Sequence, residues 1–214
     1  MKLKNNLVKL SSDKRLYQLE VPVVGLTGGI ASGKSTVSQA LEAKGLPVIN
    51  ADHLVKSIYS YEETISFISL EFPEAVIKGQ IDFKVLRQKV FLNREAKELV
   101  ERFIYQRLPE AFLSAFNKFK DPECIVYDVP LLFEKGLENL VDINVLVYAP
   151  RKIQRTRLMT RDGHLEEMAN NILGQQMNIE DKKLKAEFVI DNSQTEEELA
   201  ENINQFLRQA FIVK

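Results

Sequence analysis

The chain has 214 residues, of which 45% are hydrophobic and 28% charged, and its formal net charge at pH 7 is −1. This composition is ordinary for a globular protein that can bury a sizeable core, and the small net charge argues against a general nucleic-acid-binding surface. No apolar run reaches the length of a membrane span, and residues 1–20 lack the apolar centre of a signal peptide. We therefore expect a cytoplasmic protein with neither nucleic-acid nor membrane partners.

Residues 1–20 form an N-terminal extension, MKLKNNLVKLSSDKRLYQLE, whose pattern fits either a short amphipathic helix or a loose tail. The single cysteine of the chain, Cys124, excludes an internal disulfide. It lies in the apolar stretch ECIVYDV, so we expect a buried and unreactive thiol.

A glycine-rich turn follows the extension, in the stretch VVGLTGGIASGKSTV from 23 to 37. An apolar strand at 23–27 precedes the turn and a helix at 34–44 follows it, which disfavours a chance glycine turn. The spacing Gly28-x-x-x-x-Gly33-Lys34-Ser35 matches the P-loop, in which backbone N–H groups and a helix N-terminus bind phosphate. Lys34 is predicted to reach the β- and γ-phosphates and Ser35 to hold Mg²⁺. The predicted nucleotide-binding residues are Gly28, Gly29, Ile30, Ala31, Ser32, Gly33, Lys34, Ser35 and Thr36.

Apolar strand candidates then alternate with helical stretches and lie at 46–50, 123–128, 143–148 and 186–190. The alternation predicts an α/β fold whose parallel sheet is covered on both faces and binds ligands at the carboxyl ends of its strands. Asp52 follows the second strand candidate; it could accept a proton from an attacking alcohol or cap a helix that starts at His53. Asp128 ends the third candidate; it could help to hold Mg²⁺ through water, as a Walker-B acid does, or be a turn residue.

The region 53–120 contains no convincing strand and is predicted to be almost wholly helical. Asp82 and Asn93 are placed to cap two of its helices, and Pro109 predicts a kink or break near 105–108. This helical insertion could shape a second-substrate site or could simply pack against the sheet.

A further helical stretch, 151–178, carries Arg157 and Arg161 four residues apart on one face. Such a pair could belong to a solvated surface or to a mobile lid over a γ-phosphate. Thr195 and Glu198 form a predicted capping box that opens a last helix at 196–210. His53 and His164 are isolated; His53 could help to shape a pocket, and His164 is expected to face solvent.

Several of these stretches together resemble the dephospho-CoA kinase family. The matching segments are GLTGGIASGKSTV, GLPVINADHL, DVPLLFE (128–134), QRTRLMTRD (154–162) and QMNIEDKKLKAEFVIDN (176–192). They occur in the family's order and cover about residues 23–205. The resemblance implies a P-loop nucleoside-triphosphate-hydrolase fold with a five-stranded parallel sheet flanked by helices, a helical CoA-binding insertion and a helical lid.

The resemblance also implies a reaction, in which the γ-phosphoryl group of ATP passes to the ribose 3′-hydroxyl of dephospho-CoA to give CoA and ADP. ATP and Mg²⁺ are the implied cofactors, and dephospho-CoA is the implied small-molecule partner. Asp52 matches the presumed base, and Arg157 and Arg161 match the lid arginines. With the P-loop lysine, the catalytic set is Asp52, Lys34, Arg157 and Arg161, and the metal set is Ser35 and Asp128.

The implied organisation divides the chain into a core, an insertion and a lid. The predicted ranges are 1–20 for the N-terminal extension, 21–58, 121–150 and 179–214 for the P-loop core, 59–120 for the helical CoA-binding domain and 151–178 for the lid. We expect a monomer or a weak homo-oligomer.

The chain departs from the family's pattern in four places. They are Asn50 for the first acid of an Asp-Ala-Asp turn, Phe83 for an arginine, Tyr105-Gln106 for a His-Pro pair and Glu187 for an aspartate. We therefore expect an active but divergent kinase. The alternatives are a catalytically weakened nucleotide- or CoA-binding relative and a P-loop kinase of another small alcohol, such as a nucleoside. A GTPase switch would need an Asn/Thr-Lys-x-Asp motif, which the sequence lacks.

Overall fold

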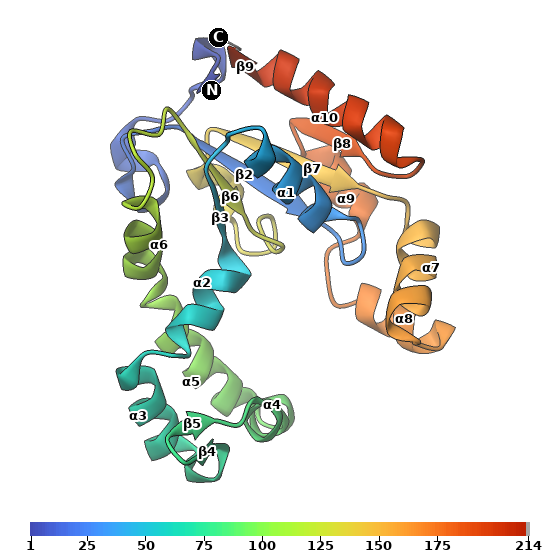
Figure 1. Ribbon diagram of the computed structural model, residues 1–214. Coiled ribbons are helices and arrows are strands. Elements are labelled where there is room, and N and C mark those ends of the chain that lie inside the picture. The colour runs from blue at the N-terminus through green and yellow to red at the C-terminus, as the bar shows by residue number, and fades with distance from the viewer. Residues whose placement is uncertain (213–214) are drawn as a thin grey trace. The chain divides into compact units, whose positions relative to one another are not determined.

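The computed structural model describes residues 1–212, so the last two residues of the predicted core segment 179–214 lie outside the described residues. The chain divides into two compact units. One comprises residues 1–50 and the chain from 120 onward, and the other comprises residues 51–119. Figure 1 labels the elements of both units.

The larger unit is built on a five-stranded parallel sheet, as predicted (Figure 1). In spatial order its strands are β3 (Val48–Asn50), β6 (Ile125–Asp128), β2 (Val23–Gly28), β7 (Ile143–Tyr148) and β8 (Phe188–Asp191). All neighbouring pairs are parallel, and every residue of β2, β6 and β7 is buried. A sheet buried on both faces explains why these strands read as continuous apolar runs.

Helices cover both faces of this sheet. The helices of the larger unit are α1 (Lys34–Ala43), α7 (Arg151–Asp162), α8 (Glu166–Leu173), α9 (Ile179–Lys185) and α10 (Glu196–Ala210). Alternate residues of a strand point to opposite faces, so Val145 and Val147 of β7 pack in the core beneath α1 and α10, whereas Leu146 packs against Ile179 of α9. The predicted capping box at Thr195 opens α10.

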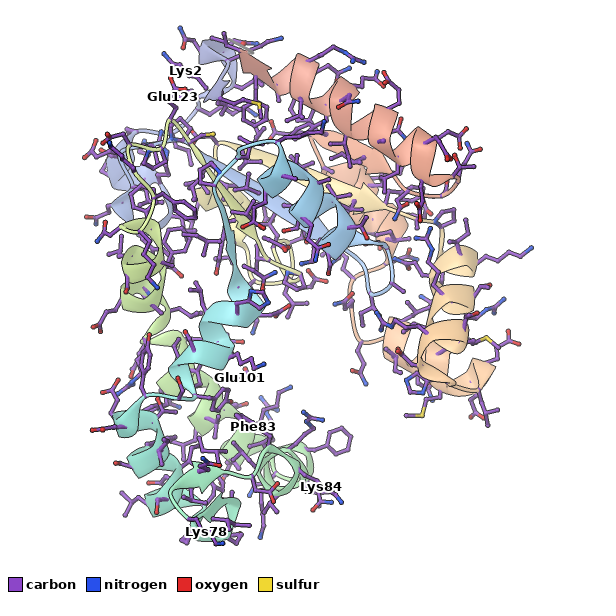
Figure 2. All side chains as sticks on the ribbon, in the orientation of Figure 1. Lys2, Lys78, Phe83, Lys84, Glu101 and Glu123 are labelled. Atoms are coloured by element: carbon purple, nitrogen blue, oxygen red, sulfur yellow. The ribbon has the colours of Figure 1, made fainter. Side chains whose placement is uncertain are left out.

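The N-terminal extension is neither the amphipathic helix nor the loose tail that the sequence allows. β1 (Lys2–Leu3) pairs antiparallel with β9 (Phe211–Ile212), and three short 3₁₀ turns follow at Asn5–Leu7, Ser12–Lys14 and Leu16–Gln18. The amino group of Met1 lies 3.6 Å from Glu123 Oε2, and Lys2 and Glu123 are seen together at one end of this unit (Figure 2). A partner strand more than 200 residues away decides this structure, so local periodicity could not reveal it.

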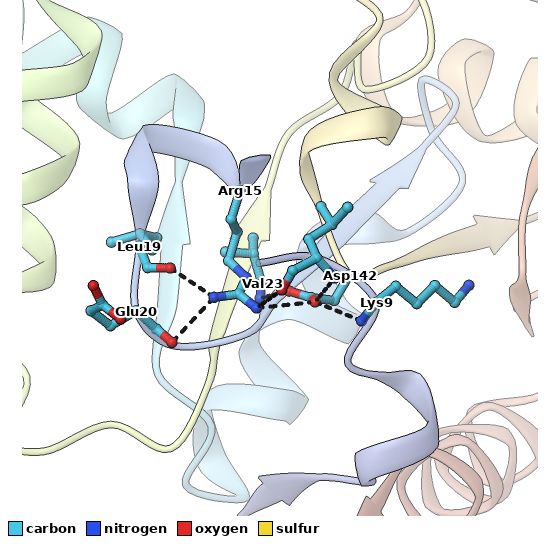
Figure 3. Close-up of polar contacts among 7 residues, drawn as sticks. Lys9, Arg15, Leu19, Glu20, Val23 and Asp142 are labelled. Carbon is cyan, nitrogen blue, oxygen red and sulfur yellow. Dashed lines mark hydrogen bonds and ion pairs between the residues drawn. The ribbon is translucent and has the colours of Figure 1, made fainter. Parts of the chain in front are cut away.

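One buried ion pair fastens the extension to the sheet (Figure 3). Arg15 Nε donates to Asp142 Oδ2 at 2.8 Å, and the two side chains are 4% and 0% exposed. The same carboxylate accepts from the backbone N–H groups of Lys9, Leu10 and Val23 at 3.0, 3.0 and 2.8 Å. Asp142 therefore joins the extension to the starts of two central strands.

The smaller unit is mainly helical, with α2 (Ala51–Ile58), α3 (Glu62–Glu71), α4 (Phe83–Leu92), α5 (Arg94–Tyr105) and α6 (Leu108–Phe116). Asp82 caps α4 through Lys84 N at 2.9 Å, and Asn93 caps α5, as predicted. The predicted break near 105–108 separates α5 from α6. One expectation is wrong, because β4 (Val76–Ile77) and β5 (Gln80–Ile81) form a small hairpin. The two-residue turn of this hairpin contains Lys78, which is labelled in Figure 2 and has a positive φ of 51°. Strands of two residues are too short to show an alternating apolar pattern, so in the sequence the hairpin is indicated by its turn and not by its strands.

Among residues 1–212, no helix combines the length and apolarity of a membrane span. Cys124 is buried, as predicted, and burial raises the pKa of its thiol to about 11, so the thiol is protonated near neutral pH.

Candidate active site

The glycine-rich turn between β2 and α1 has the backbone that its sequence predicts. β2 ends at Gly28, α1 begins at Lys34, and Gly33 just before the helix has φ of 87°. A Cβ atom at Gly33 would collide with the side-chain amide of Asn192, so the position admits only glycine. Ala31 also has a positive φ, 60°, a strained conformation that is common where backbone binds a ligand. The turn therefore leads directly into a helix N-terminus, which favours an anion.

A buried polar cluster lies at the carboxyl ends of three adjacent strands. Strand register places Asn50 of β3 and Leu26 of β2 beside Asp128, the last residue of β6. Asn50 Nδ2 donates to Asp128 Oδ2 at 2.7 Å, and Lys34 Nζ forms an ion pair with Asp128 Oδ1. The Asp128 side chain is fully buried, and a buried carboxylate requires such partners. Asp128 is therefore not a turn residue at the strand end but the centre of this cluster.

The cluster offers oxygen atoms of the kind that Mg²⁺ binds. Ser35 lies in the first turn of α1 and is exposed. The carboxylate of Asp128 is paired with the ammonium group of Lys34 in this structure. Mg²⁺ in phosphate sites takes one or two protein oxygens and completes its shell with waters and phosphates. The donor set of Ser35 and Asp128 is compatible with that chemistry.

Asp52 lies in the first turn of α2 and is exposed. The helix begins at Ala51, directly after the last residue of β3, so Asp52 is inside the helix. The alternative in which Asp52 caps a helix that starts at His53 is therefore wrong. A carboxylate in a first helical turn still gains from the helix dipole. Asp52 belongs to the smaller unit, and along the chain it follows Asn50 by two residues.

Arg157 of α7 contacts the glycine-rich turn rather than a solvated surface. Its Nη1 lies 3.4 Å from the carbonyl oxygens of both Ala31 and Ser32, and its Nη2 donates to Asn192 O at 2.8 Å. The side chain is half-buried. A cation on a helix therefore lies against backbone carbonyl oxygens of the turn.

Arg161 is one helical turn further along α7 and has different partners. Its Nε and Nη2 donate to the two carboxylate oxygens of Asp162 at 2.7 and 2.8 Å, and its side chain is 65% exposed. The two arginines predicted to act together therefore differ, since Arg157 contacts the turn and Arg161 lies at the surface. His164, expected to face solvent, is half-buried.

Three further side chains that the sequence analysis did not single out hold the backbone of the turn from the segment 176–192. The contacts are Ile30 N to Gln176 Oε1 at 3.0 Å, Asn192 Nδ2 to Ser32 O at 2.8 Å, and Lys182 Nζ to Gly28 O at 3.5 Å. One signal was present in the sequence, because Lys182 follows the apolar Ile179 by three positions and shares its buried helix face.

Comparisons with known proteins agree with this geometry. The family model of dephospho-CoA kinase matches residues 22–198. The dephospho-CoA kinase of Fusobacterium nucleatum subsp. nucleatum is 34% identical over 190 residues, which is 88% of this chain and 98% of that enzyme. The crystal structure of TT1252 from Thermus thermophilus has a TM-score of 0.78 and 30% identity, covering 88% of this chain and 97% of that one. Dephospho-CoA kinase from Campylobacter jejuni has a TM-score of 0.66 and 28% identity, covering 87% and 96%.

Proposed function

Because this chain belongs to the dephospho-CoA kinase family, we propose that the cluster at Lys34, Asn50 and Asp128 is where its reaction takes place. The protein is an ATP-dependent kinase that transfers the γ-phosphoryl group to the ribose 3′-hydroxyl of dephospho-CoA, giving CoA and ADP. The observation that carries the assignment of the site is the buried contact between the P-loop lysine and a strand-end carboxylate. The family match over residues 22–198 favours this function over a kinase of another small alcohol.

In the proposed site the nucleotide phosphates bind the backbone of residues 28–36. Lys34 leaves Asp128 and neutralises the β- and γ-phosphates, which exchanges one buried charge pair for another. Asn50 continues to donate to the second oxygen of Asp128, so the carboxylate keeps its orientation during the exchange.

The same exchange supports a role for Mg²⁺ at Ser35 and Asp128. If Lys34 turned to the phosphates, the buried Asp128 carboxylate would lose its cation and would be suited to hold a hydrated divalent ion in its place. When bound, Mg²⁺ neutralises charge on the transferring phosphoryl group. The Ser35 hydroxyl and the Asp128 carboxylate are the side chains that we propose to hold it, directly or through water.

We assign the remaining roles from residue chemistry. Asp52 is exposed and able to accept the proton of the 3′-hydroxyl as it attacks. Arg157 exchanges the carbonyl oxygens of the P-loop for phosphoryl oxygens, and Arg161 joins it when the lid at 151–178 closes. Residues 59–120 bind the CoA part of the acceptor. Phosphoryl transfer depends mainly on positioning and charge stabilisation, which are the tasks of this set.

Lys34→Ala tests the site, with Lys44→Ala, an exposed lysine at the end of the same helix, as its control. In an assay coupled to ADP release, with and without dephospho-CoA, kcat/KM for Lys34→Ala should fall by roughly 10²- to 10³-fold or more, while Lys44→Ala resembles the wild type. The folded structure, monitored by circular dichroism, should persist in both variants. Normal kinetics in Lys34→Ala would remove the P-loop assignment.

The cytoplasmic location and the monomeric or weakly associating state stay predictions. Light scattering after size-exclusion chromatography measures the second.

A further inference from the structure

Lys182 of α9 is a fully buried lysine for which the proposed reaction has no use. Its side chain has no solvent exposure. Its Nζ lies 2.9 Å from Glu134 Oε1, 3.0 Å from Pro130 O and 3.5 Å from Gly28 O. An ammonium group has three protons to donate, and these three acceptors can take all of them. A buried charge satisfied in this way is costly to place and is therefore a specific feature of the site.

The contacts of Lys182 join three segments that are far apart in the sequence. Gly28 is the last residue of β2 and the first of the P-loop, Pro130 and Glu134 belong to the loop after β6, and Lys182 belongs to the helix that follows the lid region. Glu134 Oε1 also accepts from Met177 N at 3.1 Å. The ion pair thus lies directly beside the first peptide of the P-loop.

We propose that Lys182 is a positioning residue for the nucleotide site, acting through the Gly28 carbonyl and the Pro130 loop. The proposal rests on the P-loop being that site. A trans peptide directs its C=O and N–H in opposite directions, so a cation that holds the oxygen of Gly28 directs the N–H of Gly29 away from Lys182. Glu134 neutralises the ammonium charge, and the action of Lys182 on the nucleotide is therefore geometric.

Two more hydrogen bonds to backbone carbonyl oxygens support a positioning role for side chains around the P-loop. Asn192 Nδ2 donates to Ser32 O at 2.8 Å, and Thr27 Oγ1 donates to the same Pro130 oxygen that Lys182 holds, at 3.0 Å. The carbonyl oxygens of Gly28 and Ser32 are thus both held by side chains from outside the motif. Lys182 is the charged donor at the Gly28 carbonyl, whereas Arg157 is the charged group near the Ser32 carbonyl.

The test must separate an effect on nucleotide binding from a loss of stability, because Lys182→Met leaves the Glu134 carboxylate without its cation. The double variant Lys182→Met/Glu134→Gln removes both charges and keeps an oxygen at position 134 for Met177 N, so it should recover most of the melting temperature that Lys182→Met loses. Glu134→Gln alone keeps the contacts of Lys182 with Gly28 and Pro130. Lys185→Met, which changes an exposed lysine on the same helix, is the control.

The measured quantities are the Kd of a fluorescent ADP analogue, KM for each substrate and the melting temperature. The double variant should bind the analogue about tenfold more weakly, the factor expected when one hydrogen bond to a charged phosphate, here that of the Gly29 N–H, is lost. Its KM for ATP should rise in parallel. KM for dephospho-CoA should stay within about twofold of the wild type, as should every constant of Lys185→Met. Glu134→Gln should keep near wild-type nucleotide affinity even though its melting temperature falls.

Two outcomes would overturn the proposal. A double variant with wild-type nucleotide affinity would show that Lys182 is only part of a structural ion pair. A tenfold loss of affinity in Glu134→Gln would show that the ion pair itself, and not the carbonyl contacts, controls binding. Lys34→Ala is measured in parallel to separate failure of the Lys182 proposal from failure of the P-loop assignment. Unchanged nucleotide binding in Lys34→Ala would contradict the P-loop assignment.

Discussion

Arg15→Met is predicted to destabilise the larger unit without altering catalysis. Arg15 and Asp142 are almost completely buried and paired at 2.8 Å (Figure 3). Arg15 also donates to the carbonyl oxygens of Leu19 and Glu20 at 2.7 and 3.1 Å. Methionine replaces the aliphatic part of the side chain but leaves the Asp142 carboxylate buried without a cation.

The expected loss follows from these contacts. Removing one partner of a buried ion pair costs about 3–5 kcal/mol. Three backbone N–H groups still donate to Asp142 and offset part of the cost, so we expect a loss of about 3 kcal/mol. For a chain of this size 1 kcal/mol corresponds to roughly 2–4 °C, which gives a melting temperature lower by about 6–12 °C. Asp142→Asn added to Arg15→Met removes the stranded charge and should restore part of the loss.

Urea and thermal unfolding followed by circular dichroism measure the effect, with Lys14→Met, an exposed neighbour, as the control. Steady-state kcat and both KM values at 25 °C should match the wild type, since the hydrogen bonds of Arg15 go to Leu10, Leu19, Glu20 and Asp142, none of which belongs to the candidate site. A loss under about 1 kcal/mol would refute the reasoning, as would equal losses in Arg15→Met and the double variant.

Three further predictions concern catalysis and pH. Asp52→Asn keeps the shape of the side chain and loses the proton acceptor, so kcat should fall by roughly 10²- to 10⁴-fold; a near-normal kcat would leave the base unidentified. Arg157→Met and Arg161→Met should each lower kcat more than they raise KM for the acceptor, and a change in KM alone would limit them to ground-state binding. Burial raises the pKa of Tyr148 to about 12. Because the neutral phenol is favoured in the folded state, Tyr148 stabilises the fold fully below about pH 10, and this stabilisation is lost as the pH rises toward 12. In urea unfolding, the stability advantage of the wild type over Tyr148→Phe should therefore shrink across that pH range. A constant difference would contradict the shifted pKa.

Features that depend on residues a few positions apart could be predicted from the amino-acid sequence. The glycine spacing before Lys34 fixes the P-loop because the turn and the helix start involve only consecutive residues. The side chains of Asp82, Asn93 and Thr195 cap helices through N–H groups two or three positions away. The five sheet strands are apolar because they are buried, so composition alone located them to within two residues at either end.

Which of these local features contact one another depends on how the elements pack in three dimensions. Asn50 and Asp128 are 78 residues apart, and their contact exists because β3 pairs with β6 in one particular register. Arg157 and Arg161 are equivalent in helical periodicity, yet only Arg157 contacts the P-loop. The burial of Lys182 likewise depends on acceptors from two distant segments. Such contacts depend on how whole helices and strands bury their apolar faces against one another. The spacing of residues within one element does not indicate which other element it packs against.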